Sequence, residues 1–304
     1  MVSGLSNSSK TDQVTLLTTK LLVPQPRPDI IHRPRLVERL TRAVQMGHKL
    51  TLVLAPPGSG KTTLISEWLA NLRLEGEAPN IAWLSLEKGD NEPRRFLAYS
   101  LAALQSVEPE LGTGLWADQT ITAKDLVTTL INEIAALPQQ LLLVLDDYHM
   151  IESEMIHHSL NYLLDNLPAR AHVIIASRVA LPFSLTRLRA HAEITEIGAA
   201  DLRFSAAETA LFLGNTMGLE LTEQDIAILA EKTEGWIAGL QMIALSLQSR
   251  PDINPESLAG AVTGSHRYIF DYLMEEILQH QPPYIQQFLS CTAILDRLCG
   301  PLCD

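Results

Sequence analysis

The feature that most restricts the fold of this chain is a glycine-rich run, Ala55-Pro-Pro-Gly-Ser-Gly-Lys-Thr62. It follows an apolar stretch of strand length, residues 50–55, and precedes an amphipathic helical stretch, residues 61–71. Glycine allows the positive φ angles that turn successive backbone N–H groups toward one anion. A strand, such a loop and a helix N-terminus together predict a phosphate-binding loop (P-loop), in which Ala55 fills a first position that needs a small residue.

Apolar runs and amphipathic stretches alternate through the first two hundred residues. The runs cover residues 50–55, 81–86, 141–145, 172–176 and 193–197, and helices are expected at residues 61–71, 93–105, 123–136 and 156–166. Continuous apolar runs of this length are typical of parallel strands that are covered on both faces. The sequence therefore predicts an α/β protein, a P-loop NTPase with a parallel, doubly wound sheet.

The pattern changes after residue 197. Ser205-Ala-Ala-Glu208 and Thr222-Glu-Gln-Asp225 are capping boxes that begin helices, and a third helix is expected at residues 236–248. Further amphipathic helices are expected at residues 268–279 and 284–289. The predicted domains are a disordered tail at residues 1–17, the P-loop domain at 18–200, a helical domain at 201–255 and a further domain that begins within 262–304.

The loop residues are expected to bind the phosphates and the metal ion of a nucleotide. The ammonium group of Lys61 is placed to bridge the β- and γ-phosphates of a nucleotide, and the helix dipole adds a favourable field. The hydroxyl of Thr62 is placed to coordinate Mg²⁺. The expected nucleotide-binding residues of this segment are Pro57, Gly58, Ser59, Gly60, Lys61, Thr62 and Thr63.

Two carboxylates stand at the end of the third predicted strand, where Leu145 is followed by Asp146 and Asp147. Burying carboxylates at a strand end is unfavourable unless a cation pairs with them, and a hydrated Mg²⁺ on a bound nucleotide would do so. We expect Asp146 to hold the metal through water and Asp147 to polarise the attacking water. Because aspartate is one methylene shorter than the glutamate common at the second position, hydrolysis is expected to be slow.

The next predicted strand ends at Ser177 and Arg178. An arginine there can reach the γ-phosphate, and we count Arg178 with Asp147 as a catalytic candidate; a surface arginine on a loop is the alternative. We expect several other residues to be structural or exposed to solvent. They are the histidines His149, His157 and His158 as solvated or helix-surface residues, Glu87, Asp90 and Glu92 as a solvated loop, and Trp83 and Trp236 as core aromatics.

Composition narrows the classes of function. The 304 residues carry a formal net charge of -12, which argues against DNA binding by this stretch itself, because neutralising phosphates needs a basic face. Residues 1–13 lack the apolar core of a signal peptide, and no apolar run reaches about 18 residues. We therefore expect a soluble, cytoplasmic chain with no membrane contact. Cys291, Cys299 and Cys303 are expected to be buried, reduced thiols.

Taken together, the motifs resemble the MalT-like branch of the signal-transduction ATPases with numerous domains (STAND). The resemblance extends from about residue 18 to residue 304. It rests on Thr19-Lys-Leu-Leu22, His32-Arg-Pro-Arg-Leu36, the P-loop, Ala82-Trp-Leu-Ser-Leu86, Gly89-Asp-Asn91, Leu145-Asp-Asp-Tyr-His149, Ala176-Ser-Arg178, Asp201-Leu-Arg-Phe204, Glu234-Gly-Trp236, Ala238-Gly-Leu-Gln241 and Phe270-Asp-Tyr-Leu273.

The resemblance implies a nucleotide-operated switch from a transcriptional activator that binds ATP or ADP with Mg²⁺. It implies that the domain within residues 262–304 is the beginning of a winged helix, and it adds Arg33 and Gly239 to the nucleotide-binding residues. Gly239 stands where relatives contact adenine through a Gly-x-Pro element, and this chain lacks the proline. Such proteins self-associate when bound to ATP, respond to an inducer through a sensor domain and usually end in a LuxR-type helix-turn-helix. We expect the chain to be a fragment or core of such a protein.

Two alternatives stay open at this point. A P-loop small-molecule kinase or other phosphotransferase would need an acceptor pocket and a lid with arginines, which the helical region does not clearly supply. A scaffold with an empty P-loop would not need Lys61, Thr62 and Asp146 to be intact.

The charge balance gives a direct prediction about DNA. At physiological salt and about micromolar protein, the chain should not retard duplex DNA, because it lacks the basic face that releases counterions. A gel-shift assay checks this, and a retarded band for either specific or random duplex would contradict the prediction.

Overall fold

The computed structural model describes residues 16–74, 79–114, 122–248, 274, 278–279 and 282–293. The chain divides into two compact units. The first comprises Met1–Pro26, His32–Ala55 and Lys61–Asp201, and the second comprises Arg27–Ile31, Pro56–Gly60 and Leu202–Asp304. The expected helix at residues 268–279 lies largely outside the described residues, as do Cys299 and Cys303.

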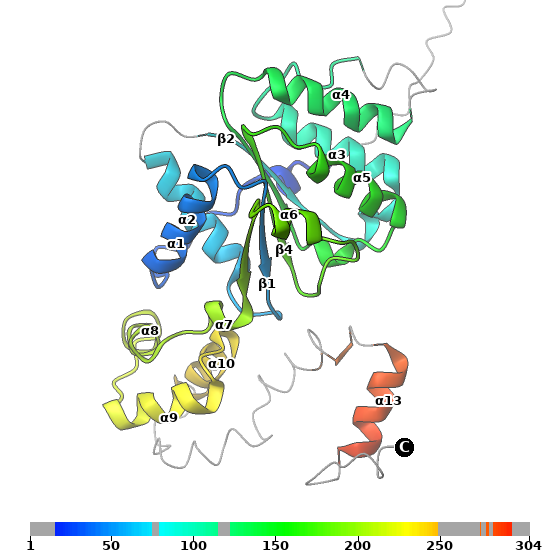
Figure 1. Ribbon diagram of the computed structural model, residues 1–304. Helices are drawn as coiled ribbons and strands as arrows, with labels where there is room; N and C mark the ends of the chain where they lie inside the picture. The colour runs from blue at the N-terminus through cyan, green and yellow to red at the C-terminus, as the bar shows by residue number, and fades with distance from the viewer. Residues whose placement is uncertain are drawn as a thin grey trace, which may run out of the picture. The chain divides into compact units, whose positions relative to one another are not determined.

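The first unit is built on a parallel sheet (Figure 1). Its strands are β1 (Leu50–Leu54), β2 (Asn80–Ser85), β3 (Leu141–Asp146), β4 (Ala171–Ser177) and β5 (Ile194–Gly198). Their order is β2-β3-β4-β1-β5, and every neighbouring pair is parallel. The predicted α/β class and the five expected strands are confirmed.

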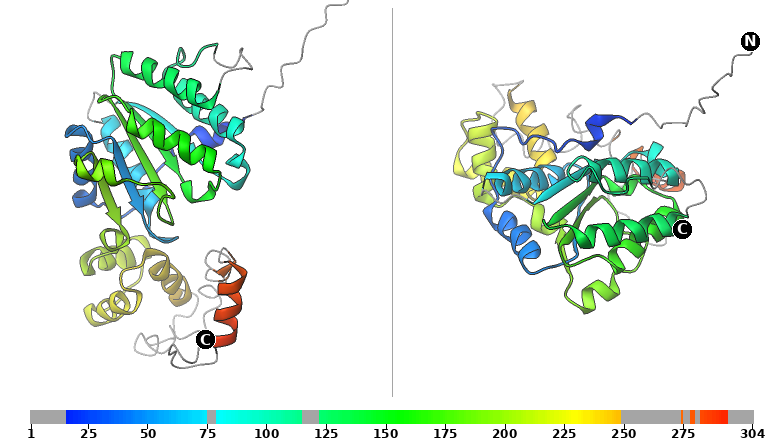
Figure 2. Two further views of the ribbon diagram at one scale, coloured as in Figure 1. Left: turned by 45° about the vertical axis from the view of Figure 1, so that its right-hand side comes forward. Right: turned by 90° about the horizontal axis from the view of Figure 1, so that it is seen from above.

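Helices cover both faces of this sheet (Figures 1 and 2). They are α1 (Pro34–Gln45), α2 (Lys61–Leu74), α3 (Pro93–Gln105), α4 (Ala123–Ala136), α5 (Glu154–Asp165) and the short α6 (Thr186–Ala190). Helices α1 and α2 lie on one face, and α3, α4 and α5 lie on the other. Because both faces are covered, β3 and β4 are buried along their whole length.

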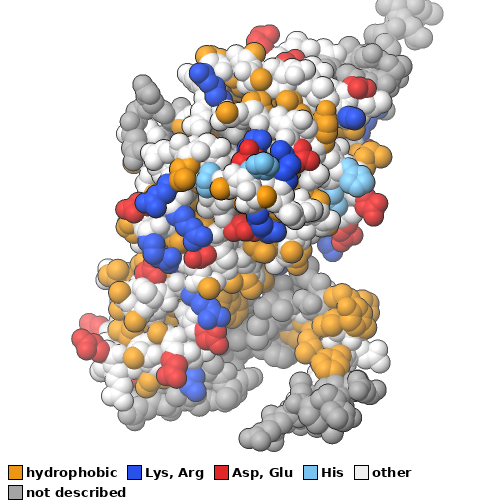
Figure 3. All heavy atoms as spheres, viewed as in Figure 1, with side chains coloured by type: hydrophobic (Ala, Val, Ile, Leu, Met, Phe, Trp, Pro, Cys, Tyr) orange, Lys and Arg blue, Asp and Glu red, His pale blue; other side chains and the backbone are white. Residues whose placement is uncertain are grey.

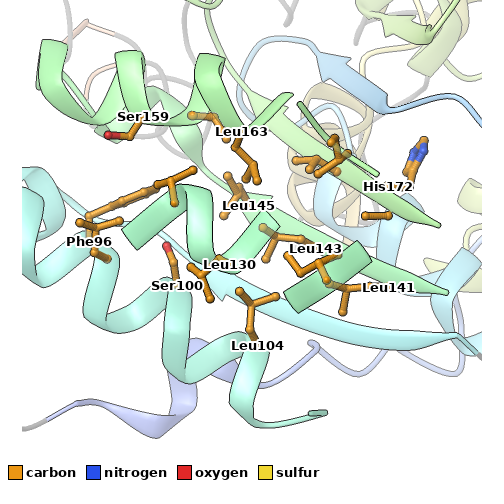
Figure 4. Close-up of a pocket in the computed structure, with 17 residues that line it drawn as sticks. Phe96, Ser100, Leu104, Leu130, Leu141, Leu143, Leu145, Ser159, Leu163 and His172 are labelled. Carbon is orange, nitrogen blue, oxygen red and sulfur yellow. The ribbon is translucent and has the colours of Figure 1, made fainter. Parts of the chain in front are cut away.

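A small cavity lies in the core between the sheet and α3, α4 and α5 (Figure 4). Its volume is about 50 Å³, and apolar side chains such as Leu130, Leu143 and Leu145 line nearly all of it. An apolar void of this size has too few polar partners to hold ordered water. We therefore assign it to the core and not to a ligand site.

The second unit contains short helices, which are α8 (Ala206–Leu211), α9 (Glu223–Thr233), α10 (Ile237–Gln248) and α13 (Pro283–Thr292). Both predicted capping boxes form, at Ser205 with Glu208 and at Thr222 with Asp225. A π-helical turn, Phe212–Thr216, extends α8, and a short α7 (Ala199–Leu202) follows β5. Gly235 ends α9 with a φ of 70°, and a Cβ there would meet the Phe204 carbonyl oxygen at 2.3 Å.

Several expectations about exposed or buried side chains are wrong. His149 is not solvated, since only 11% of its side chain is exposed, and Trp236 is half-buried and not a core aromatic. Asp90 is fully buried, because Lys20 and Arg95 both pair with its carboxylate. His157 is also buried, and its Nδ1 lies 2.8 Å from the Tyr148 hydroxyl oxygen. Cys291 is a free but exposed thiol.

The described residues were also considered for membrane-spanning helices and for charged surface patches. Among them, no helix is both long and apolar enough to cross a bilayer. On the face drawn in Figure 3, basic and acidic side chains are interspersed and do not separate into single-sign patches.

His172 is a buried histidine at the start of β4, with 1% of its surface exposed. Its Nδ1 lies 2.6 Å from the His48 carbonyl oxygen, so this nitrogen carries the proton and donates. Its Nε2 lies 2.8 Å from the Thr51 hydroxyl oxygen and accepts from it. Burial lowers the pKa of His172 from 6.5 to about 4.

This histidine should make the chain less stable in acid. Between pH 6.5 and pH 4 the unfolded chain binds the proton at His172 and the folded chain does not. The free energy of unfolding therefore falls as pH falls through this window, by about 3 kcal/mol. Urea unfolding at pH 7 and at pH 4.5 measures the loss in the parent and in His172→Gln, where other titrating groups contribute equally. The variant should lose less stability than the parent, and equal losses would exclude this role for His172.

Candidate nucleotide-binding site

The predicted P-loop connects the end of β1 to the beginning of α2. Gly58 and Gly60 both have positive φ angles, 69° and 79°, as the phosphate-binding conformation requires. Ala55 is buried at the start of the loop, which agrees with the need for a small residue there. Ser59 is buried and Thr63 is exposed.

Lys61 is the first residue of α2, and 7% of its surface is exposed. Its Nζ donates to the Ala55 carbonyl oxygen at 2.8 Å, so the side chain turns back along the loop. Burial lowers the pKa of Lys61, and the nearby charges of Asp147, Arg178 and Asp146 also act on it. The side chains of Asp146, Asp147 and Arg178 therefore lie close enough to Lys61 to influence its charge.

Asp146 is the last residue of β3 and is 3% exposed. The Thr62 hydroxyl donates to its carboxylate, at 2.9 Å from Oδ2 and 3.2 Å from Oδ1. Burial, and next the charge of Asp147, raise the pKa of Asp146 to about 6. The carboxylate is therefore poorly stabilised as an anion by the protein alone, and a bound cation would stabilise it.

Asp147 follows with a left-handed backbone, φ 56° and ψ 39°. Its N–H donates to Asp146 Oδ1 at 3.1 Å, and its own carboxylate is 40% exposed. His149 Nδ1 lies 3.8 Å from Asp147 Oδ1. The carboxylate of Asp147 is thus reachable from solvent, as the polarisation of a water molecule requires.

The strand order explains why these residues meet. In a parallel sheet all carboxyl ends lie at one edge, and β4 stands between β3 and β1. Asp146 at the end of β3, Arg178 just after β4 and Lys61 just after the loop that follows β1 are therefore neighbours. Residues from three separated segments of the sequence form one site.

The structure gives Arg33 and Gly239 other contacts. Arg33 is buried, its Nη2 donates to the Asp201 carbonyl oxygen at 3.2 Å, and its backbone N–H donates to Glu67 Oε1 at 3.4 Å. Gly239 lies in α10, where a Cβ would meet the Trp236 ring at 2.7 Å. Gly239 is therefore required for packing of this tryptophan, and the nucleotide contacts of both residues stay predictions.

Contacts of the loop within the second unit were missed by sequence reasoning. Trp236 is only half-buried, and its indole N–H donates to the Pro57 carbonyl oxygen at 3.1 Å. The backbone N–H of Ala238, in the first turn of α10, donates to the Gly58 carbonyl oxygen at 3.1 Å. The capping box and the Gly-Trp pair predicted the helices here, but no local pattern indicates which distant carbonyl groups they bind.

The donor set fits a nucleotide with Mg²⁺. The Asp146 carboxylate and the Thr62 hydroxyl supply hard oxygen atoms, which Mg²⁺ prefers. Among the described residues, no group of three or more His, Cys, Asp or Glu could hold a metal. Mg²⁺ usually completes its ligands with phosphate oxygens and water.

Comparison with known families gives two matches. The family described as a MalT winged helix domain matches residues 274–304. The family described as an AAA domain matches residues 44–186, which include the P-loop, Asp146, Asp147 and Arg178.

Curated relatives match nearly the whole chain. A serine/threonine-protein kinase, PknK of Mycobacterium tuberculosis, is 32% identical over 290 residues, covering 93% of this chain and 25% of the relative. The HTH-type transcriptional regulator MalT of Serratia proteamaculans is 32% identical over 289 residues, covering 92% of this chain and 30% of the relative. The chain thus spans less than a third of the length of these relatives.

Solved structures show the same fold at low identity. A Walker-type ATPase of Pyrococcus abyssi matches with a TM-score of 0.53 and 14% identity, over 91% of this chain and 84% of that chain. The ORC1 protein of Aeropyrum pernix, in complex with DNA, matches with a TM-score of 0.50 and 13% identity, over 90% of this chain and 74% of that chain. At this identity the likeness concerns the fold alone.

The geometry predicts a loss of binding when Lys61 is removed. Lys61→Ala should weaken ADP binding by about 10- to 150-fold, because a charge-assisted hydrogen bond to phosphate contributes roughly 1.5–3 kcal/mol. Isothermal calorimetry measures the change. Lys49→Ala is the matched control, since Lys49 precedes the opposite end of β1 and pairs with Glu193. Unchanged ADP affinity in Lys61→Ala would exclude the assigned role of this loop.

Proposed function

Because this chain belongs to the MalT-like proteins, we propose that it is an ATP- and ADP-binding switch module of a transcriptional regulator. The observation that carries this proposal is the buried Asp146 carboxylate hydrogen-bonded to Thr62, beside a P-loop with Lys61. Such a regulator works in the cytoplasm, where ATP is available. The STAND and LuxR-type assignments, and slow ATP hydrolysis that resets the switch, are parts of the proposal.

The relatives support a regulatory module over a dedicated enzyme. One is named a protein kinase and another a transcriptional regulator, yet both match the chain at 32% identity over almost all of it. A segment shared by proteins with different outputs does not itself define either output. This favours a nucleotide-controlled module, and it does not favour the small-molecule kinase left open by the sequence.

Different residues of the chain bind the nucleotide and promote its hydrolysis. Lys61 and the loop N–H groups hold the phosphates. Thr62 and Asp146 would hold a Mg²⁺ ion, which would neutralise charge on the phosphates. The exposed carboxylate of Asp147 orients the attacking water and accepts its proton. Arg178 stabilises the negative charge that develops on the γ-phosphate.

Phosphate occupancy must also reach the helical part of the chain if the module is a switch. The loop uses its N–H groups for phosphate, whereas its Pro57 and Gly58 carbonyl groups bind Trp236 and Ala238. A change of loop conformation on nucleotide exchange would alter these two hydrogen bonds directly. We therefore assign the transmission of nucleotide state to the beginning of α10.

Switching requires that ATP and ADP bind two arrangements of the protein with different affinities, because equal affinities shift no population. We propose that the ADP-bound form is the resting one. In the whole protein, an inducer sensed elsewhere together with ATP would allow self-association, and hydrolysis would reverse it. DNA binding would belong to a different part of such a regulator.

Asp147→Asn should separate binding from turnover. The variant should bind ATP with Mg²⁺ as the parent does but hydrolyse it about tenfold more slowly or worse, because the amide is a poor base. Single-turnover release of phosphate measures the rate, and calorimetry measures the affinity.

Asp165→Asn is the matched control, because Asp165 ends α5 and binds Arg187 away from the site. Hydrolysis by Asp147→Asn at the parent rate would show that its proposed role is wrong.

A further inference from the structure

The Asn91 side chain joins two loops at the carboxyl edge of the sheet. Its Nδ2 donates to the Lys88 carbonyl oxygen at 3.0 Å and to the Met150 carbonyl oxygen at 2.8 Å. Its Oδ1 accepts from the backbone N–H of Glu152 at 2.6 Å and of Ser153 at 3.1 Å. One amide thus connects the loop after β2 to the loop after β3.

These four partners specify asparagine at this position. Two carbonyl groups face Nδ2 and two N–H groups face Oδ1, so the orientation of the amide is fixed by its surroundings and every hydrogen-bonding valence is used. Aspartate would present an oxygen to both carbonyl groups, glutamine would add a methylene, and alanine would leave all four groups without this partner.

The loop that carries Asn91 is itself held firmly. Asp90 is fully buried, and its carboxylate accepts from the Glu87 N–H at 2.9 Å and from Arg95 Nε at 3.2 Å. Lys20 pairs with the same carboxylate and lies over the Tyr99 ring, 4.2 Å from its centroid. The Thr19–Leu22 and Gly89–Asn91 motifs, which lie outside the proposed nucleotide contacts, are therefore joined through Lys20 and Asp90.

The supported loop holds Asp147. The Met150 N–H donates to the Asp147 carbonyl oxygen at 3.0 Å, while the Met150 carbonyl accepts from Asn91. Left-handed backbone at a residue other than glycine is unfavourable and persists where the surroundings impose it. On the other side of the loop, Tyr148 is buried and contacts His157. The contacts of Asn91 and Tyr148 together impose the conformation that Asp147 adopts.

We propose that Asn91 is a positioning residue for ATP hydrolysis, acting through the backbone of the loop that carries Asp147. The inference rests on the proposed function, and in particular on Asp147 as the group that orients water. Asn91 is not one of the proposed nucleotide-binding residues. Its loss lets the Asp147 carboxylate sample other positions, which lowers the rate of hydrolysis and leaves ATP affinity unchanged.

A double-mutant cycle in the full chain tests this proposal. Asn91→Ala should lower the single-turnover hydrolysis rate about tenfold, with the affinity for Mg-ATP within about twofold of the parent. In the Asp147→Asn background, Asn91→Ala should lower the rate no further, because the group it positions is already lost. Asn91→Asp keeps the acceptor atoms for Glu152 and Ser153 and should fall between the parent and Asn91→Ala.

Hydrogen exchange gives a readout that does not depend on turnover. Exchange in a peptide covering residues 147–155 should be about tenfold faster in Asn91→Ala, because the Glu152 and Ser153 N–H groups lose their acceptor. Asn166→Ala is the matched control, since Asn166 also binds a backbone carbonyl group, that of Tyr162 at 2.9 Å, at the far end of α5. It should change neither exchange in that peptide nor the hydrolysis rate.

Failure of the inference about Asn91 and failure of the proposed function would give different results. Parent-like hydrolysis by Asn91→Ala, or the same fold-loss in both backgrounds of the cycle, overturns the inference and leaves the proposed function in place. Unchanged exchange in residues 147–155 also overturns it. A parent chain that binds ATP but does not hydrolyse it overturns the hydrolytic part of the proposed function and the inference together.

Discussion

The buried carboxylate of Asp146 is the constraint on which the rest of the site depends. Its position at the end of β3 removes it from water, and the protein supplies only a hydroxyl from Thr62 and one backbone N–H. Burial raises the pKa of Asp146 to about 6, and these two donors offset only part of that increase. A strand that places an anion at this point is stable only if positive charge is near. Lys61 contributes such a charge, and a nucleotide-bound cation would add to it under the proposed function. Strand order brings those charges to the same edge.

The P-loop has two sets of backbone groups with different partners. Gly58 and Gly60 have left-handed conformations, which suit the loop N–H groups to the phosphate binding that we propose. The Pro57 and Gly58 carbonyl groups bind Trp236 and Ala238, which belong to the same compact unit as the loop. Gly239 permits the tryptophan to pack there, since any side chain would overlap its ring. A nucleotide-controlled switch needs a link of this kind between ligand and helices.

Much of the fold and the centre of the site follow from local sequence patterns. The apolar runs located all five strands, because buried parallel strands need continuous apolar residues, and the loop and Asp146 follow directly from strand ends. The roles of Asp90, Asn91, His157 and Trp236 were missed. Their partners lie far away in the sequence: Asn91 binds residues about sixty positions later, and Trp236 binds a residue 179 positions earlier. Side chains that bind distant backbone groups leave no periodic signal. Asp90 and His157 were therefore assigned to solvent and Trp236 to the core, and Asn91 was given no role of its own.

We propose above all that this chain holds an adenine nucleotide through its P-loop. The most direct measurement adds Mg-ADP to one of two samples of the purified chain and removes unbound nucleotide from both by gel filtration. The chain is then denatured, and the released nucleotide is identified by mass spectrometry. We expect ADP or ATP at about one molecule per chain in at least the supplemented sample. Release of no adenine nucleotide from either sample, with the chain folded, would contradict it.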